Sequence, residues 1–302
     1  MTETEVIKPP RGFSEICSIM VTYFPEAEVA SNARAILEQV DHLIVVDNGT
    51  SDLSFLQSGP FQKPHCTVIR WNENFGIAAA LNEGVRAAIK MGYKWVLTMD
   101  QDSRLPEGCI EEMIHVWSTC GSRSNIAMVG PNYEGANRFQ TATSGALEHT
   151  SDYAIVKEII TSGTLMPTTL FESIGEFRED LFIDMVDIEF CLRARRRGFS
   201  VAVALKTRMQ HQLGSTKALP WIGGISSHPP LRNYYRFRNS VLIIKEAWGY
   251  DWHFVFSRSK KMLLIAVKIV LFERPWLKNV SSVARGICHG LIGRSGKAEG
   301  IE

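Results

Sequence analysis

The sequence predicts an α/β fold with a mostly parallel sheet flanked by helices, followed by a helical C-terminal segment. Short apolar stretches, typical of buried strands, alternate with stretches of helical periodicity. A strand, a helix and a further strand in that order form a unit whose strands run parallel. The expected strands are residues 15–23, 42–47, 66–71, 95–99, 126–130, 157–166 and 199–205, of which the strand at 157–166 is expected to break at Ser162-Gly163. The clearest helical patterns are at 25–40 and 77–91.

Polar or small residues end each of the first four predicted strands. They are Thr22 and Tyr23, then Asp47, then Asn74 and Gly76, and finally Asp100 and Asp102. In an open α/β sheet the ligand crevice lies outside the carboxyl ends of the strands, so this pattern predicts a nucleotide site. Asp47 is expected to accept hydrogen bonds from a base or ribose, or to cap a turn. Asn74 is expected near the ligand, or as a simple helix cap.

The segment Asp100-Gln101-Asp102 carries two carboxylates where a strand gives way to a loop. Mg²⁺ and Mn²⁺ take oxygen ligands, often one or two carboxylates together with substrate phosphates. The segment therefore predicts an acidic metal site for a diphosphate, and the alternative is a solvated turn. No G-x-G-x-x-G follows the first strand and no G-x-x-x-x-G-K-[ST] occurs, which disfavours a dinucleotide cofactor and a P-loop.

A second acidic block lies at residues 181–198, where Asp184, Asp187 and Glu189 precede a run of arginines. Helical periodicity begins at Asp187, which places this acid at a helix N-terminus facing the ligand edge of the sheet. The alternative is a capping Asp on a solvated helix with Glu–Arg pairs. His211 also follows a predicted strand, and its alternative is a structural histidine.

Charge is distributed unevenly along the 302 residues, although the net charge is only +1. Residues 231–302 carry 13 Lys and Arg against 5 Asp and Glu, so this segment suits an anionic surface, either membrane or nucleic acid. Nucleic acid is disfavoured because the acids at the strand ends would repel phosphate. The 6 cysteines are scattered without a C-x-x-C pair, which disfavours a zinc site or disulfide framework and fits a reducing cytosol.

Taken together, these motifs resemble family 2 glycosyltransferases with the GT-A (Rossmann-like) fold, and among them bacterial rhamnosyltransferases of O-antigen and polysaccharide assembly. The motifs are VTYFP, VVDNGTSD, NENFGIAAALNEG, LTMDQDS, SGTLM, FIDMVDIEFCLRARRRG, HQLGS and RNYYRFRN, which span residues 14–240. The resemblance implies an inverting transfer of a sugar, L-rhamnose from dTDP-L-rhamnose, to a hydroxyl of a lipid-linked saccharide. A UDP- or GDP-sugar donor and a non-catalytic nucleotide-sugar binding protein are the alternatives. A nucleotidyltransferase is disfavoured, because VTYFPEAEVA has no Gly-rich basic loop.

The resemblance also implies roles for individual residues. The nucleotide-sugar site would include Thr22, Tyr23, Asp47, Asn74, Gly76, Asp100, Gln101 and Arg236. Asp102 and His211 would bind Mg²⁺ or Mn²⁺, and Asp187 would be the catalytic base. The acid that precedes this base in the family's motif is replaced by Val186, which leaves Asp184 as the alternative base.

The predicted organisation is an N-terminal tail at 1–13, a catalytic domain at 14–230 and a basic amphipathic helical segment at 231–302. The run from Arg232 to Asn239 would clamp a diphosphate, or would be a basic helix face packed on the core. The apolar, basic helix after His253 is expected to lie on an anionic membrane, which predicts a cytoplasmic protein at the inner face of the cell membrane. Its alternative partners are the catalytic domain or a second copy of the chain in a homo-oligomer.

Overall fold

A computed structural model describes residues 8–57, 59–134, 143, 146–211, 216–219, 223–226 and 229–299. The chain forms two compact units, which are described separately. The first consists of Met1–Phe177 and Phe190–Leu213, and the second of Arg178–Glu189 and Gly214–Glu302. One of the boundaries between the units, that between Glu189 and Phe190, falls within helix α5 (Val186–Arg196).

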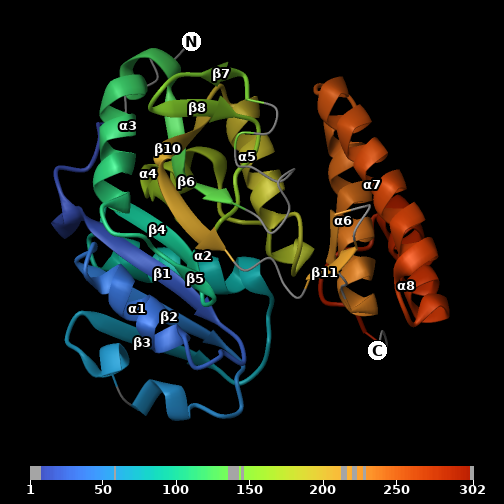
Figure 1. Cartoon of the computed structure of the whole chain (residues 1–302), viewed down its shortest axis with the longest axis horizontal. Coiled ribbons are helices and arrows are strands. Elements are labelled where there is room, and N and C mark those ends of the chain that lie inside the picture. Colours follow the sequence, from blue (N-terminus) through green and yellow to red (C-terminus); the bar gives the residue numbers. More distant parts are fainter. Residues whose placement is uncertain are drawn as a thin grey trace. The chain divides into compact units, whose positions relative to one another are not determined.

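The first unit is built on a mixed sheet (Figure 1). Its strands are β1 (Ile16–Thr22), β2 (His42–Asn48), β3 (Cys66–Trp71), β4 (Trp95–Asp100), β5 (Ser103–Arg104), β6 (Ile126–Glu134), β7 (Glu148–His149), β8 (Tyr153–Val156), β9 (Thr164–Pro167) and β10 (Ser200–His211). Its helices are α1 (Val29–Leu37), α2 (Ile77–Lys90), α3 (Cys109–Ser124), α4 (Thr169–Ile174) and the greater part of α5.

The strand order in the sheet is β3-β2-β1-β4-β9-β6-β10-β8-β7, and β5 pairs with β10. The first four strands run parallel, as the alternation of strands and helices predicted. Strand β9 differs, because it lies antiparallel between β4 and β6. The strand that precedes β9 in the chain is β8, and no helix lies between the two strands. The connection to β9 is therefore not a helical crossover, which would require a parallel strand.

Alternate residues of the parallel strands supply the cores on the two faces of the sheet. One face contributes Met20, Val45 and Leu97, which pack with buried residues of α1 and α3 in a single apolar cluster. On the other face, α2 approaches so closely that a Cβ atom at Gly84 would collide with a methyl group of Ile19. Both faces of the sheet are therefore covered, which fits strands that are apolar throughout.

The second unit contains three long helices, α6 (Pro230–Ala247), α7 (Trp252–Phe272) and α8 (Trp276–Leu291), which lie side by side (Figure 1). A two-stranded ribbon, β11 (Thr216–Leu219) and β12 (Gly223–Ser226), belongs to the same unit. Gly286 and Gly290 allow α8 to approach α6, since Cβ atoms there would lie 2.6 Å from the Tyr234 carbonyl oxygen and 2.7 Å from that of Arg238. Among the described helices, none has the length and hydropathy needed to cross a bilayer.

Candidate active site

The ends of β1 and β2 are joined by a buried hydrogen-bond network around Asp47, which is 0% exposed. Its Oδ2 accepts hydrogen bonds from the hydroxyls of Thr22 (2.8 Å) and Thr50 (2.7 Å), and its Oδ1 accepts one from the Thr50 amide (2.8 Å). These bonds satisfy a carboxylate that burial would otherwise penalise. Thr22 and Asp47 therefore order the loop after β2, and direct contact of either with a nucleotide stays a prediction.

The side chain of Gln101 joins the end of β4 to the end of β1 through two hydrogen bonds. Its Oε1 accepts from the Tyr23 amide at 2.7 Å and its Nε2 donates to the Tyr23 carbonyl at 3.1 Å. The Gln101 backbone carbonyl in turn accepts from the Asn32 side chain at 2.9 Å. The amide group of Gln101 thus acts as a strand partner for Tyr23, a residue that is 46% exposed.

Asn48 and Asn74 join the ends of β2 and β3. The Asn48 side chain donates to Asn74 Oδ1 (3.1 Å) and accepts from the Phe75 amide (2.9 Å). Asn74 Oδ1 also accepts from the Gly76 amide at 2.8 Å, at the N-terminus of α2. Gly49 has a φ of 96°, and a Cβ atom there would lie 2.6 Å from the Glu73 carbonyl carbon, so only glycine fits this close approach.

The end of β4 also packs against the segment that precedes β9. Ser162, which is fully buried, accepts a hydrogen bond from the Asp100 amide at 3.2 Å. Gly163 has a φ of 78° and donates to the Thr98 carbonyl at 2.7 Å, and a Cβ atom there would lie 2.7 Å from Pro131. The strand predicted at 157–166 forms from Thr164 onward, and the left-handed Gly163 lies at the predicted break.

Asp102 lies in the turn after β4, and its side chain is exposed. Within the described residues its carboxylate accepts no hydrogen bond. The next residue, Ser103, pairs with His211 in the antiparallel ladder of β5 and β10. The fold therefore brings the backbone of His211 beside the Asp100–Asp102 turn, although these residues are about 110 positions apart in the chain.

The Asp102 carboxylate suits a hard divalent cation, because Mn²⁺ and Mg²⁺ sites use carboxylate oxygens when phosphates and water complete the coordination. Among the described residues, no group of three or more His, Cys, Asp and Glu side chains could hold a metal alone, and the His211 side chain lies outside that description. A site here would need the ligand's own oxygens.

Asp187 and Asp184 belong to the second unit. Asp187 lies in the first turn of α5, where its Oδ1 accepts from the Ile188 amide at 2.8 Å. Asp184 is ion-paired with Arg232, with Nε 3.3 Å from a carboxylate oxygen. Consecutive positive φ values at Asp184 (62°) and Met185 (70°) shape the loop that leads into the helix. Such conformations cost about 1–3 kcal/mol each for ordinary residues and persist only where other contacts impose them.

Helix α6 supplies the contacts that hold this loop. The Asn239 side chain donates to the carbonyl oxygens of Leu181 (2.8 Å), Ile183 (2.8 Å) and Asp184 (3.0 Å). Arg238 is 1% exposed and donates to the Leu181 carbonyl at 3.1 Å. The run from Arg232 to Asn239 is thus partly a core element, since Arg238 and Asn239 fix the loop before α5.

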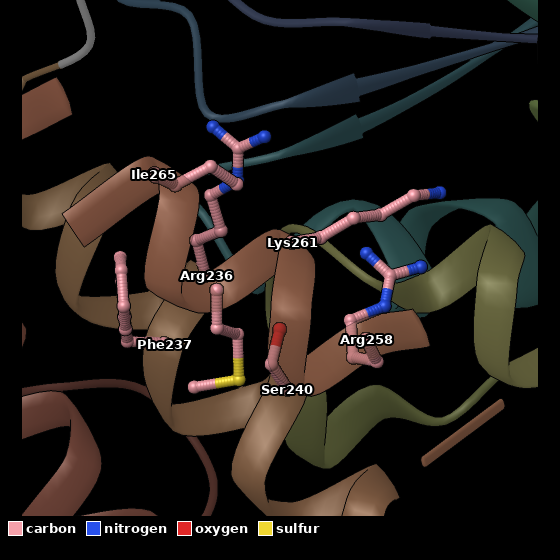
Figure 2. Close-up of a pocket in the computed structure, with 7 residues that line it drawn as sticks. Arg236, Phe237, Ser240, Arg258, Lys261 and Ile265 are labelled. Atoms are coloured by element: carbon pink, nitrogen blue, oxygen red, sulfur yellow. The ribbon is translucent and has the colours of Figure 1, made fainter. Parts of the chain in front are cut away.

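Arg236, in contrast, lines a small pocket between α6 and α7 (Figure 2). Burial and the charges of Arg232 and Arg258 lower the pKa of Arg236, while Asp184 and Glu273 oppose that shift. Its predicted role toward the nucleotide sugar stays a prediction.

Residues 17–173 match the profile of glycosyl transferase family 2. The chain belongs to this family. It is 31% identical to dTDP-rhamnosyl transferase RfbF of Shigella flexneri over 249 aligned positions, and the alignment covers 77% of this chain and 81% of that protein. It is also 22% identical to the low-salt glycan biosynthesis hexosyltransferase Agl10 of Haloferax volcanii over 312 aligned positions, 93% of each protein. The protein is therefore a glycosyltransferase.

Solved structures confirm the GT-A fold of this glycosyltransferase. S. aureus TarS 1–349 superposes with a TM-score of 0.57 at 14% identity, covering 90% of this chain and 80% of that one. A structure of GalNAc-T7 with UDP, GalNAc and Mn²⁺ gives 0.59 at 9% identity, covering 94% of this chain and 57% of that one. At these identities the likeness concerns the fold.

Nine of the eleven residues predicted for the glycosyltransferase site lie in the first unit, at or beside the ends of its strands. Asp187 and Arg236 lie in the second. Sequence reasoning missed the supporting residues Asn48, Thr50 and Ser162, which hold the loops through side-chain hydrogen bonds. The sequence does carry a pattern that could have identified them. Each of these residues stands in a cluster of turn-forming Asn, Gly, Ser or Thr that follows or precedes a strand.

Proposed function

We propose that this glycosyltransferase is an inverting, metal-dependent rhamnosyltransferase that moves L-rhamnose from dTDP-L-rhamnose to a lipid-linked saccharide of a cell-surface polysaccharide. The observation that carries the metal-dependent transfer is the exposed Asp102 carboxylate beside the β5–β10 pairing of Ser103 with His211. The relationship to the dTDP-rhamnosyl transferase of Shigella flexneri supports the donor. A UDP- or GDP-sugar remains the alternative donor.

In the proposed mechanism, Asp102 and His211 would hold Mg²⁺ or Mn²⁺. The chemistry supplied by a cation bound there would be neutralisation of the charge that develops on the leaving nucleoside diphosphate. Tyr23, Asn74 and Gly76 line the nucleotide-sugar pocket, while Thr22, Asp47 and Gln101 keep the strand-end loops in place.

Asp187 is the proposed general base, which takes the proton from the acceptor hydroxyl as that oxygen attacks the sugar. Its position in the first turn of a helix suits an anionic carboxylate, because the helix dipole favours negative charge there. Asp184 is less suited to the role, since Arg232 already engages its carboxylate.

We place the enzyme in the cytoplasm, peripherally at the inner face of the membrane. In this proposal, residues 14–230 form the catalytic domain and residues 231–302 form a basic helical segment that contacts the lipid. Exposed apolar side chains on α7 support this contact, among them Phe256 (73% exposed), Leu263 (65%) and Leu271 (64%).

Binding and turnover of a panel of nucleotide sugars would test the proposal. We expect dTDP-L-rhamnose to bind in the presence of Mn²⁺ or Mg²⁺, and its transfer or slow hydrolysis to be lost with chelator and restored by the metal. Preference for a UDP- or GDP-sugar would overturn the rhamnosyl assignment alone. Turnover that persists in chelator would remove the metal from the mechanism.

A further inference from the structure

After the end of α8, the chain returns to the loop before α5. Residues 295–298, here called the return segment, are joined by hydrogen bonds to this loop and to α6. The Gly296 amide donates to the Asp180 carbonyl at 2.6 Å, and the Ala298 amide donates to the Tyr235 hydroxyl at 2.7 Å. All of these residues belong to the second unit. The return segment therefore supports a loop that is distant from it in the sequence.

Arg238 connects the return segment to the loop before α5. Its Nη1 donates to the Gly296 carbonyl at 2.5 Å, while its Nη2 donates to the carbonyl oxygens of Asp180 (3.2 Å) and Leu181 (3.1 Å). Its guanidinium also lies 4.8 Å from the centroid of the Tyr235 ring. Because a guanidinium is planar and donates several hydrogen bonds in fixed directions, this one side chain can hold both segments.

The loop before α5 has a backbone conformation that needs such support. Phe182 has a φ of 66°, in addition to the positive φ values of Asp184 and Met185. Residues other than glycine rarely adopt positive φ, and they keep it only where their surroundings impose it. The Phe182 ring stacks on Tyr235 at a centroid distance of 5.1 Å. Tyr235 thus contacts the loop with its ring and the return segment with its hydroxyl.

The first turn of α5 is built directly on this loop. The Glu189 amide donates to the Met185 carbonyl at 2.9 Å, and Asp187 lies within the same turn. A change in the conformation of Met185 would therefore move the start of the helix. The position of the Asp187 carboxylate depends on the conformation of the loop.

We propose that the return segment and Arg238 position Asp187 for glycosyl transfer. They act through the loop before α5, so Arg238 is a positioning residue and not a catalytic one. This inference rests on the proposed function, in which Asp187 is the general base. It also gives a role in transfer to residues that lie beyond the family-like motifs, which end at residue 240.

Two adjacent tyrosines of α6 provide a matched pair of variants. Tyr235→Phe removes the acceptor of the Ala298 amide and keeps the ring, whereas Tyr234→Phe removes a hydroxyl that shares a hydrogen bond with His289 of α8 at 2.7 Å. Both tyrosines are 1% exposed, so we expect the two variants to lose similar stability.

The first measurement is hydrolysis of dTDP-L-rhamnose by the full-length protein, with water in place of the acceptor hydroxyl. We expect Tyr235→Phe to lower kcat about fivefold, the equivalent of one hydrogen bond, with an unchanged KM for the donor. The second measurement is hydrogen exchange of the backbone amides of residues 180–185. We expect faster exchange there in Tyr235→Phe, and neither effect in Tyr234→Phe.

Gly296→Ala changes the return segment itself. Gly296 has a φ of 85° and a Cβ atom there meets nothing within 4 Å, so alanine introduces backbone strain without a clash. Gly92→Ala is its control, because Gly92 has a φ of 90°, equally open surroundings and a place in the first unit. Gly296→Ala should reproduce the loss of kcat and the faster exchange, and Gly92→Ala should reproduce neither.

Equal values of kcat in the two tyrosine variants would overturn the inference, and so would unchanged exchange of the loop in both Tyr235→Phe and Gly296→Ala. Faster exchange with an unchanged kcat would restrict the return segment to a role in stability. Failure of the proposed function is read separately. Normal turnover in Asp187→Asn, or no turnover of dTDP-L-rhamnose by the wild type, would contradict that function, whereas hydrogen exchange still decides whether the return segment orders the loop.

Discussion

At the scale of single residues, two polar side chains that the sequence offers as ligand contacts serve the fold in this structure. Asp47 uses both of its oxygens to accept hydrogen bonds from Thr22 and Thr50, and Gln101 pairs with the backbone of Tyr23. Each hydrogen bond to a buried charge is worth roughly 1.5–3 kcal/mol. These residues therefore give the loops a defined shape, on which recognition of a nucleotide would depend.

Asp187, the proposed general base, can be tested by removing its ability to take a proton. Asp187→Asn should lower kcat by roughly 10²–10⁴-fold, the usual contribution of a general base, while donor binding changes little. The measurement is single-turnover transfer together with the Kd for the nucleotide sugar.

Asp184→Asn is the matched control for that variant, because it removes a carboxylate from the same loop without touching the proposed base. A loss of kcat confined to Asp184→Asn would move the base to Asp184. A loss of donor affinity in Asp187→Asn would indicate a structural carboxylate instead.

At the scale of secondary-structure elements, close packing of α8 on α6 supports the loop before α5. Helix α6 carries Asn239, which binds three carbonyl groups of that loop, and α8 packs against the same part of α6 through Gly286 and Gly290. A larger residue at either glycine would push α6 away from α8, so the shape of the loop depends on two helices that are distant in sequence.

Gly286→Ala should destabilise the protein by about 1–3 kcal/mol, since the added Cβ meets the Tyr234 carbonyl oxygen, which cannot move aside. Chemical denaturation followed by circular dichroism measures this change. Gly249→Ala is the control, because a Cβ there meets nothing within 4 Å. Similar midpoints for both variants would show that α8 can withdraw without cost.

At the scale of the whole molecule, charge and exposed apolar surface are concentrated in the C-terminal part of the chain. Residues 231–302 carry a net +8, and the remainder a net −7. An exposed apolar stripe on α7, made of Phe256, Leu263, Val267, Val270 and Leu271, belongs to the same part. This combination suits binding to an anionic membrane in which both electrostatic and hydrophobic terms act.

Binding to vesicles of anionic phospholipid should therefore weaken as salt rises, and Leu263→Ser should weaken it roughly tenfold at any salt concentration, because less apolar area is buried. Leu147→Ser is the control, since Leu147 is similarly exposed (60% against 65%) but lies in the first unit. Vesicle co-sedimentation is the measurement. Unchanged binding by Leu263→Ser would assign the stripe to a protein contact.

The sequence by itself determined the fold class and the approximate bounds of β1 to β4, because buried parallel strands are continuous apolar runs that stand out from amphipathic helices. It also placed the polar residues at one edge of the sheet, since the carboxyl ends of parallel strands meet there. It could not extend β10 beyond residue 205 to His211, because Lys206, Thr207 and Arg208 lack the apolar pattern of a buried strand.

Only the tertiary structure decided which of these polar groups are buried with hydrogen-bond partners inside the protein and which are exposed. Asp47 and Asp102 follow strands in the same way, yet the first is enclosed by two threonines and the second is exposed. The antiparallel direction of β9 and the pairing of His211 with Ser103 join residues distant in the chain. Such pairings depend on three-dimensional packing and leave no periodic signal in the sequence, which records local propensity and spacing.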